Sequence, residues 1–545
     1  MLTDRVCLWV VLCLSLSGLG SAEAGESVVR RVPLYDNLGT LHHPITTRSQ
    51  EAQRYFDQGL RFAYAFNHEE AIRAFEEAAK RDATAAMAYW GIALALGPNI
   101  NTTMKKTDER RAWDALQKAR SYSAHVTRAE QAYIYAMGKR YRPTGSNRPV
   151  QDTAYADAMR TLWQQFPEDP DAGALFAEAL MDLHPWDHWT TTGRPKSGTE
   201  EIVSTLEKVL AKVPNHPGAC HYYIHAMEAS PTPERALACA ERLPGLMPGA
   251  GHLVHMPAHI LMRLGRYHDA AERNAQAAEI DRRYLAGSSL TNDYADGYYR
   301  HNLHFLWASL AMEGRSGEAL KVARQLISLI TQEDARKDPW KELYLPVSLW
   351  SMIRFGLWEE LLRELPPPNT LRLKQAIWRL GRGMALAASG RLPGAEGEHA
   401  ALAILAKRFG RNKTTEEQTE RALIHLAERL LAGEIAAHRK QYETAVTALR
   451  EGVKLEEALP YSEPPFWPIP VRHYLGVVLQ KAGRAHEAES VYRTDLNKNP
   501  HNGWALYGLM QSLRAQRKDR EANEVEKQWK RAWAHADVTL VASRF

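Results

Sequence analysis

The strongest constraint in this sequence is a helical pattern that continues from about residue 51 to the carboxyl terminus. Ala, Leu, Glu and Arg recur at spacings of three and four residues, which place them on single faces of α-helices. Short breaks rich in Gly, Pro or Asn interrupt the pattern, and we find no stretch that predicts a β-strand. A chain of 545 residues exceeds the size at which a single core stops growing, about 250 to 300 residues. The pattern therefore predicts an all-α protein that is either elongated or divided into several domains.

A helix–turn–helix unit repeats along this pattern. Gly59 is followed by Ala71, Phe75 and Ala78, and Trp90-Gly91 follows Gly59 after 32 residues. Comparable sets are Gly265 with Ala270, Asn274 and Ala277, and Gly483 with Ala488, Tyr492 and Pro500. These positions resemble the turn glycine, the small residues of the second helix and the closing proline of the tetratricopeptide repeat (TPR) family. The resemblance implies a TPR-like α-solenoid, a right-handed superhelix of roughly ten helix pairs, over residues 51–545. Residues 97–150 and 396–425 match the repeat poorly.

The first 24 residues have the pattern of a secretory signal peptide. Asp4 and Arg5 precede an apolar stretch from Val6 to Leu19, and Ala22-Glu23-Ala24 offers the small residues of a cleavage site. That stretch is too short to span a bilayer comfortably, and no later stretch approaches about 18 uninterrupted apolar residues. We therefore predict a signal peptide at 1–24, an N-terminal arm at 25–50, no membrane span, and a periplasmic or secreted protein. In sequence, the chain looks like exported bacterial TPR-like proteins.

Charge and motifs exclude several classes of function. The 69 basic and 64 acidic residues give a net charge of +5 and are spread along the whole chain, so no basic block predicts nucleic-acid binding. The sequence contains no nucleotide-binding loop, no Ser-His-Asp elbow, no CxxCH haem-attachment motif and no HExxH zinc motif. Function must therefore be sought in the residues that line the solenoid.

Histidines gather on the expected inner face of three consecutive repeats, at about residues 171–312. In the TPR family the first helix of each unit faces the concave side, and its second, fifth, ninth and twelfth positions point inward. The resemblance assigns eight residues to such positions, and these are His221, His225, Glu228, His252, His255, His259, His301 and His304. Their spacings of three, four and seven residues keep each set on one face of its helix.

Imidazole clusters of this kind suit transition metals, because adjacent helices can converge several neutral histidine nitrogens on one ion. A mononuclear centre uses three or four ligands, so the seven histidines predict either two neighbouring ions or one ion with additional substrate-binding groups. Copper is favoured over zinc or iron. Glu228 is a candidate catalytic residue at the edge of the cluster, and four nearby residues are further candidate ligands: Met227, Met256, Asp293 and Asp296. In the simpler alternative, these histidines only hydrogen-bond the backbone or bind acidic peptides. The distant His473 occupies a similar inner position, where it either approaches the same centre or is solvated.

A long connection precedes the histidine-rich repeats. It begins with His184-Pro185-Trp186-Asp187-His188-Trp189 and runs for about fifteen residues, whereas turns in a solenoid are normally a few residues long. We predict that it covers the groove, with His184 and His188 as candidate catalytic residues. The alternative is an ordinary surface loop held by a buried tryptophan. Asn99 and Asn101 lie in another extended turn, predicted on the same side.

Cys220 and Cys239 are predicted to lie opposite each other in a helical hairpin that turns near Ser230-Pro231. In an oxidising compartment a disulfide is expected. Two buried thiols, or a thiolate metal ligand at Cys220, are the alternatives.

Two functional hypotheses of different class follow. The first is a metal-dependent enzyme, hydrolytic or oxidative, acting on a small molecule or a peptide in the concave groove. The second is a TPR scaffold that holds a protein partner in the cell envelope without catalysis. A metallochaperone would share the metal with the first hypothesis but would lack turnover.

Overall fold

The computed structural model describes residues 32–545 except 144, 146, 288–293, 338 and 408–413, so the predicted signal peptide lies outside the described residues. Residues 34–545 form one compact unit. Its described part consists of α-helices and short helical turns, with two isolated β-bridges and no strand, which confirms the all-α prediction. Among the described residues, no helix is both long and apolar enough to cross a membrane.

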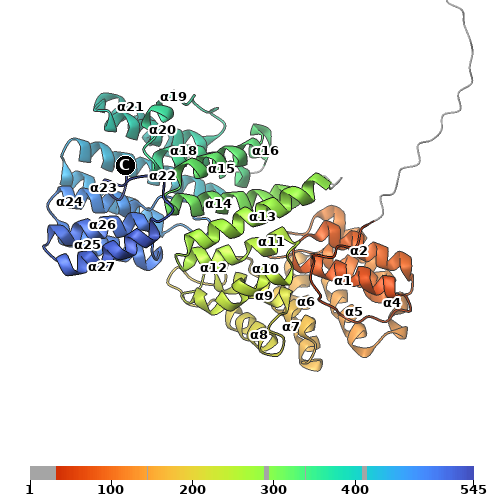
Figure 1. The fold of residues 1–545 in the computed structure, drawn as a ribbon. Helices are drawn as coiled ribbons and strands as arrows, with labels where there is room; N and C mark the ends of the chain where they lie inside the picture. Colours follow the sequence, from red (N-terminus) through yellow and green to blue (C-terminus); the bar gives the residue numbers. More distant parts are fainter. Residues whose placement is uncertain (1–31, 144, 146, 288–293, 338, 408–413) are drawn as a thin grey trace, which may run out of the picture. The chain divides into compact units, whose positions relative to one another are not determined.

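The helices form consecutive pairs in which each helix packs against the next along the chain, from red α1 to blue α27 in Figure 1. The pairs are α1 (Gln50–Tyr64) with α2 (His68–Arg81), α3 (Ala86–Ala95) with α4 (Glu109–Tyr122), α5 (Arg128–Arg140) with α6 (Arg148–Gln165), α7 (Pro170–Met181) with α8 (Thr199–Lys212), α9 (Pro217–Met227) with α10 (Leu237–Leu246), α11 (Gly251–His255) and α12 (Pro257–Arg263) with α13 (Tyr267–Gly287), α14 (Arg300–Glu313) with α15 (Ser316–Ser328), α18 (Val347–Arg354) with α19 (Trp358–Arg363), α20 (Arg372–Ala388) with α21 (Leu392–Lys407), α22 (Thr415–His438) with α23 (Tyr442–Glu457), α24 (Val471–Lys481) with α25 (Ala485–Lys498), and α26 (Gly503–Ala515) with α27 (Asp519–Ala532). The shorter elements are η1 (Lys106–Asp108), η2 (Ser123–His125), η3 (Pro233–Ala236), the π-helical turn η4 (Ala295–Tyr299), α16 (Gln332–Lys337) and α17 (Pro339–Glu342). Helix pairs are present at 97–150 and 396–425 as well, where the sequence matches the repeat poorly.

The recurring glycines and aromatic residues of the repeat pack against each other between helices. A methyl group on Gly59 of α1 or on Gly91 of α3 would lie 2.6 or 2.5 Å from the ring of Phe75 on α2. The Phe75 side chain is fully buried. The ring therefore fills the space between the first helices of two successive units, and glycine is required on both sides because any side chain would collide with it.

The chain also makes contacts between repeats that are far apart in sequence. Helix α1 packs against α9, and α14 packs against α26. The indole Nε1 of Trp504 donates a hydrogen bond to the carbonyl of Ala311 over 3.2 Å. A methyl group on Gly265 would come within 2.0 Å of the carbonyl oxygen of Pro500. The repeats thus close on one another, and the inner helices of the histidine-rich units do not line an open groove.

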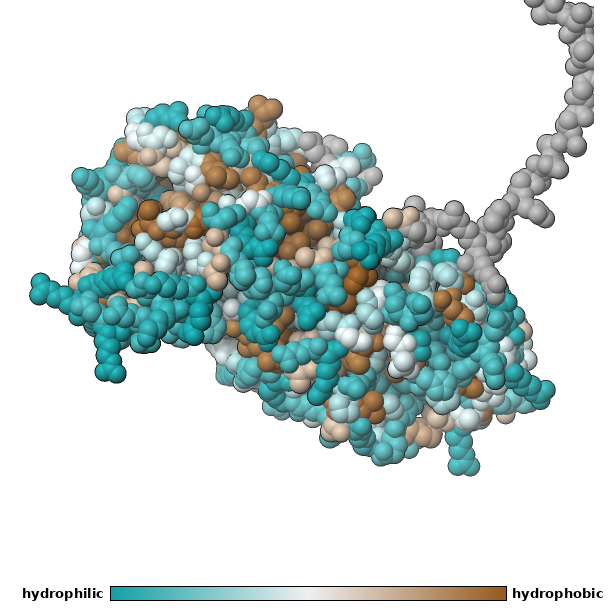
Figure 2. Space-filling view, in the orientation of Figure 1, coloured by the Kyte–Doolittle hydropathy of each residue, from teal (hydrophilic) through white to brown (hydrophobic). Residues whose placement is uncertain are grey.

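The surface seen in Figure 2 is largely hydrophilic, with separate apolar patches. Beneath the surface, Cys220 and Cys239 are buried as two thiols whose sulfur atoms lie 2.6 Å apart. Their predicted proximity is confirmed, and the disulfide stays a prediction.

Candidate metal centre

Six of the seven predicted histidines come together inside the protein. His221 and His225 lie on α9, His252 and His255 on α11, His259 on α12 and His301 at the start of α14. The ring centroids of neighbouring members lie 4.8 to 6.3 Å apart. Five of these histidines are at most 4% exposed, namely His221, His225, His252, His255 and His259. The local reason is that each set projects from one face of its helical segment, and the segments α9, α11 with α12, and α14 belong to successive repeats.

The six histidines divide into two groups of three. The first group is His221, His225 and His252, and the second group is His255, His259 and His301. In each group, one ring nitrogen from every member lies within 4.8 Å of the others. Three histidine nitrogens at this separation can be drawn onto one transition-metal ion by small side-chain movements, since metal–nitrogen bonds are about 2.0 to 2.1 Å long.

Hydrogen bonds at Nδ1 orient four of these rings. The Nδ1 atom of His221 lies 2.7 Å from the carbonyl oxygen of Tyr64, and that of His255 lies 2.6 Å from the side-chain oxygen of Asn274. Because these partners only accept hydrogen bonds, we assign the proton of each ring to Nδ1. The Nε2 atom of each ring then carries a free lone pair, which is the arrangement of a metal-ligating histidine.

A single buried carboxylate, Glu228 at the end of α9, serves both groups. Its Oε1 atom accepts a hydrogen bond from Nδ1 of His225 over 2.9 Å, and its Oε2 atom contacts Nδ1 of His259. Only 1% of Glu228 is exposed, so the residue lies beneath the histidines and not at the edge of a groove as predicted. Burial alone would raise its pKa, but the neighbouring His259 and His225 lower it to about 2. Glu228 is therefore a carboxylate whose negative charge is balanced by His259.

Within each group, the Nε2 atoms of two histidines lie close together. Those of His221 and His252 are 3.1 Å apart, and those of His255 and His259 are 2.9 Å apart. With the protons of His255 and His259 held at Nδ1, two lone pairs would face each other unless a cation lies between them. Burial lowers the pKa of His255 far below 6.5, whereas Glu228 and Glu463 overcome the same burial at His259 and raise its pKa to about 10. The second group therefore accommodates one positive charge, which a proton or a metal ion can supply.

Glu463 is a member of this site that sequence reasoning missed. It lies in the connection between α23 and α24, and its Oε2 atom is 3.3 Å from Nδ1 of His259. Burial raises the pKa of Glu463 above its ordinary value, although His259 opposes the rise. More than two hundred residues separate these two side chains in the sequence, so only the closure of the chain brings them together.

Aromatic side chains cover the cluster. Phe66, in the turn after α1, packs against His221 at 4.5 Å and stacks on His252 at 5.8 Å between ring centroids. Its backbone has a φ of 56°, a left-handed conformation that is unusual for a bulky residue and that places the ring over the first group. Tyr298 lies 4.3 Å from His252, and Trp186 meets His225 edge-on at 5.2 Å. The cluster is consequently an enclosed site, which corrects the expectation of histidines exposed along a groove.

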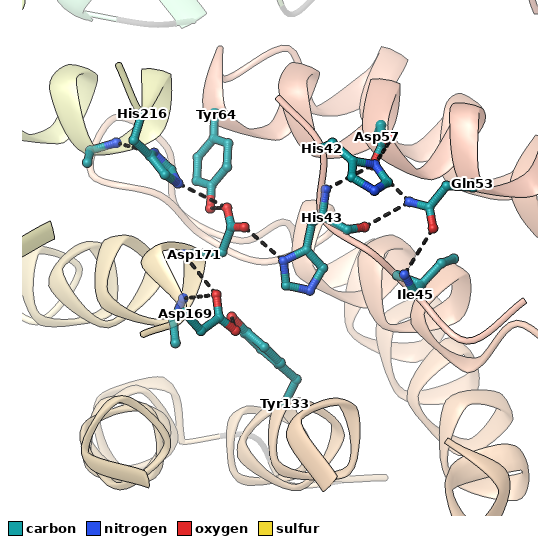
Figure 3. Close-up of polar contacts among 12 residues, drawn as sticks. His42, His43, Ile45, Gln53, Asp57, Tyr64, Tyr133, Asp169, Asp171 and His216 are labelled. Atoms are coloured by element: carbon teal, nitrogen blue, oxygen red, sulfur yellow. Dashed lines mark hydrogen bonds and ion pairs between the residues drawn. The ribbon is translucent and has the colours of Figure 1, made fainter. Parts of the chain in front are cut away.

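His43 of the N-terminal arm is connected to the same site through Asp171 and Tyr64. Figure 3 shows Asp171 at the centre of a network with His43, Tyr64 and His216. Asp171 accepts hydrogen bonds from Nδ1 of His43 over 2.8 Å and from the hydroxyl of Tyr64 over 2.5 Å. Since the carbonyl of Tyr64 accepts the hydrogen bond from His221, this network fixes the acceptor that orients His221.

His304 lies apart from the cluster. Its ring stacks on Trp307 at 5.4 Å and meets Tyr344 at 5.1 Å, and it belongs to neither group of three. His304 packs against these aromatic rings instead, although His252 and His255, which are also three residues apart, both belong to the cluster.

The loop after α7 lies over the first group, as predicted, but its two histidines differ in placement. His188 is 7% exposed, and it lies close enough to Glu228 and His225 to interact with them electrostatically. Its Nε2 atom is buried without a hydrogen-bond partner. His184 is exposed to solvent. The indole of Trp189 donates to the carbonyl of Ala226 over 2.7 Å and holds the loop against α9.

The remaining candidates are scattered. Met227 and Met256 are buried beside the histidines in sequence, whereas Asp293 and the side chain of Asp296 lie outside the described part of the chain. Asn101 approaches the hydroxyl of Tyr298 at 3.4 Å, which places its turn on the side of the cluster; Asn99 instead folds back on Thr102 within that turn. His473 is neither solvated nor part of the cluster, because it is buried between Asp495 and Arg354, each 3.0 Å away.

Comparisons with known proteins give no family for this chain. No protein-family model and no curated protein matches it. Among solved structures, a human IFIT1 dimer with m7Gppp-AAAA is 13% identical over 90% of this chain and 92% of that chain, with a TM-score of 0.29. The Cut9–Hcn1 hetero-tetramer of APC/C is 14% identical over 90% and 78%, with a TM-score of 0.32, and the TPR domain of P58(IPK) is 11% identical over 86% and 99%, with a TM-score of 0.23. Similarity at this level says nothing of activity, and the assignment of the fold rests on the helix pairs themselves.

Proposed function

We propose that this protein binds two transition-metal ions side by side, one in each group of three histidines, and that it is a metal-dependent enzyme. The observation that carries the proposal is that, in both groups, one ring nitrogen from each of three histidines lies within 4.8 Å of the others, with four of the six rings bonded through Nδ1 to acceptors. Either a proton or a metal ion can lie between the nitrogens of each close pair, and the convergence of a third imidazole on each pair is what favours a metal ion.

The donor set favours copper over zinc or iron. Each group offers three imidazoles, with carboxylates of the second group placed at Nδ1 of His259, and copper(II) binds such nitrogen donors more tightly than the other divalent ions of its row. Bound metals would supply either redox chemistry with dioxygen or a water activated for hydrolysis. Glu228 then keeps His225 and His259 in the orientation that ligation requires, which makes it a positioning residue for both groups.

The enclosed site favours a small molecule over a peptide as substrate. Trp186 contacts His225 and is 42% exposed, more than Phe66 or Tyr298, so it is the aromatic residue of the cover that faces solvent. We propose that a substrate enters beneath this side chain, where the unpaired Nε2 atom of His188 can bind or deprotonate it. The predicted leader at 1–24 would place this reaction in the periplasm or outside the cell.

The test is the metal content of untagged protein purified from the exported fraction. We expect about two copper ions per chain, and we expect His301→Ala to lose the ion of the second group while helicity by circular dichroism is retained. His304→Ala is the matched control, because it removes a histidine one turn away on the same helix. It should leave the metal content unchanged.

A protein that carries no stoichiometric metal, and that copper, zinc, iron, nickel and manganese all fail to stabilise against heat, would contradict the proposal. The alternative, a TPR scaffold that binds an envelope protein without catalysis, would then take its place.

A further inference from the structure

A second cluster of histidine and carboxylate side chains lies outside the six-histidine centre. His268 stands in the first turn of α13, Glu313 is the last residue of α14, and His535 follows α27 near the carboxyl terminus. The Nδ1 atom of His268 is 2.8 Å from Oε1 of Glu313, and the rings of His268 and His535 stack with centroids 3.9 Å apart. One donor atom from each of the three lies within 4.8 Å of the others.

The carboxyl-terminal segment is fixed on both sides of His535. Before it, the ring of Trp533 packs against Gly314 and Gly503, where an added methyl group would meet the ring at 2.5 and 2.1 Å. After it, the carboxylate of Asp537 accepts hydrogen bonds from the backbone N–H groups of Ser316 and Gly317 over 2.7 and 2.9 Å. His535 is therefore held opposite His268 by contacts that do not involve either imidazole.

The side chain of Glu313 is also held in place by a neighbouring residue. Its side chain is 4% exposed, and its second oxygen, Oε2, accepts a hydrogen bond from Arg315 over 3.2 Å. The arginine neutralises part of the charge and leaves Oε1 directed at His268. A buried carboxylate with one oxygen paired and the other beside an imidazole is a common setting for metal ligation.

The cluster opens onto a cavity of about 500 Å³, which Arg266, His501, Gln528 and Arg531 also line. The cavity lies where the turn before α13 meets the turn before α26 and the carboxyl-terminal segment. His535 itself is exposed, so its ring has room to tilt out of the stack and turn a nitrogen toward an ion.

From this geometry we infer that His268, Glu313 and His535 form a zinc site separate from the six-histidine centre. Two imidazoles and one carboxylate are a donor set that zinc uses when a fourth position stays open for water, and here the fourth position faces the cavity. The ion would also join the carboxyl-terminal segment to α13 and α14, two elements more than two hundred residues earlier in the chain. The site differs from the histidine centre in its donors, its exposure and its location, so each can exist without the other.

The experiment measures zinc bound per chain by equilibrium dialysis of the full-length mature protein, followed by elemental analysis. We expect His268→Ala/His535→Ala to bind one zinc ion fewer than the wild type. His501→Ala is the matched control, since His501 lines the same cavity but lies outside the triad, and it should bind as many zinc ions as the wild type.

A second variant tests ligation directly. His535→Cys places a thiolate where we infer a ligand, and in the presence of cobalt(II) it should gain the near-ultraviolet thiolate-to-cobalt absorption band that the wild type and His501→Cys lack. The inference is overturned if the double variant binds as much zinc as the wild type, or if His535→Cys shows no such band. Neither outcome bears on the histidine centre, which His301→Ala tests separately.

Discussion

At the scale of single residues, one carboxylate contacts histidines of both groups. Both oxygens of Glu228 are used, one for His225 and one for His259, and these two rings belong to different groups. A side chain of this kind sets the tautomer of its partners and raises their basicity. Its removal should therefore affect both proposed metal ions together.

We predict that Glu228→Gln weakens metal binding by about 10- to 100-fold while the helical content stays the same. Glutamine keeps the shape but has one acceptor oxygen, so one histidine faces an N–H group and loses its orientation. Affinity is measured by competition with a chelator of known affinity. The control is Glu428→Gln, which alters another buried carboxylate that bonds a histidine, His399, outside the cluster. Equal effects of the two substitutions would refute the special role of Glu228.

At the scale of elements, the arm before α1 is anchored by side chains from several repeats. The backbone N–H and the hydroxyl of Thr46 donate to Glu130 over 2.7 and 2.6 Å, and the hydroxyl of Thr47 donates to Asp82 over 2.6 Å. His43 reaches Asp171 on α7 (Figure 3). The arm thus connects the end of α2 with α5 and α7, and through Asp171 it reaches Tyr64 at the end of α1, whose carbonyl contacts His221.

The anchor at His43 should weaken at high pH. Burial lowers the pKa of His43, but the hydrogen bond and charge of Asp171 prevail, together with the charges of Asp169 and Asp57, and raise it to about 9. Because the pKa is raised, the stabilisation is complete below about pH 6.5 and is lost as the pH rises through 9. Asp171, which also faces His216 and Tyr64, has a lowered pKa and stays charged throughout this window.

We therefore expect the difference in unfolding free energy between the wild type and His43→Gln to shrink by up to about 3 kcal/mol between pH 6 and pH 10. Urea denaturation of both proteins at each pH measures it, and comparing the two proteins cancels the titration of groups elsewhere. A difference that stays constant with pH would show that His43 acts by packing alone.

At the scale of the whole molecule, contacts between distant repeats bury the helix faces that carry the histidines. The α1–α9 contact carries Phe66 over the histidines, and the connection between α23 and α24 delivers Glu463 to His259. Each further contact of this kind excludes water from the cluster. A low-dielectric, enclosed site strengthens the electrostatic interactions within it.

Two turn glycines test closure directly. Gly265 and Gly390 both have left-handed backbones, with φ of 72° and 75°, so replacement by alanine costs about 1 to 2 kcal/mol at each. The methyl group at Gly265 would also collide with the carbonyl of Pro500, whereas at Gly390 it meets no described atom within 4 Å. We predict that Gly265→Ala lowers the free energy of unfolding by about 1 to 3 kcal/mol more than Gly390→Ala. Equal losses in urea denaturation would mean that these turns do not meet in solution.

Two site residues that reasoning from sequence missed depart from the pattern of the repeat. Asn274 occupies the position where other units have an aromatic packing residue, Phe75 or Tyr492, and its polar side chain orients His255. Phe66 stands where other units have a turn glycine, as at Gly265. A polar residue at a packing position and a bulky residue at a left-handed position are both local departures that could have been singled out. Glu463 offered no such signal.

The sequence by itself determined the helices, their pairing and the side of each helix on which the histidines lie, because periodicity and neighbour packing act over a few residues. It placed His221, His225, His252, His255, His259 and His301 on one face, whereas His304, assigned to the same face, packs against Trp307 and Tyr344. Only the tertiary structure decided that the face is enclosed and that Glu463, Phe66 and the Tyr64 carbonyl belong to it. The physical reason is that closure depends on small rotations accumulated over many repeats, and no local pattern records their sum.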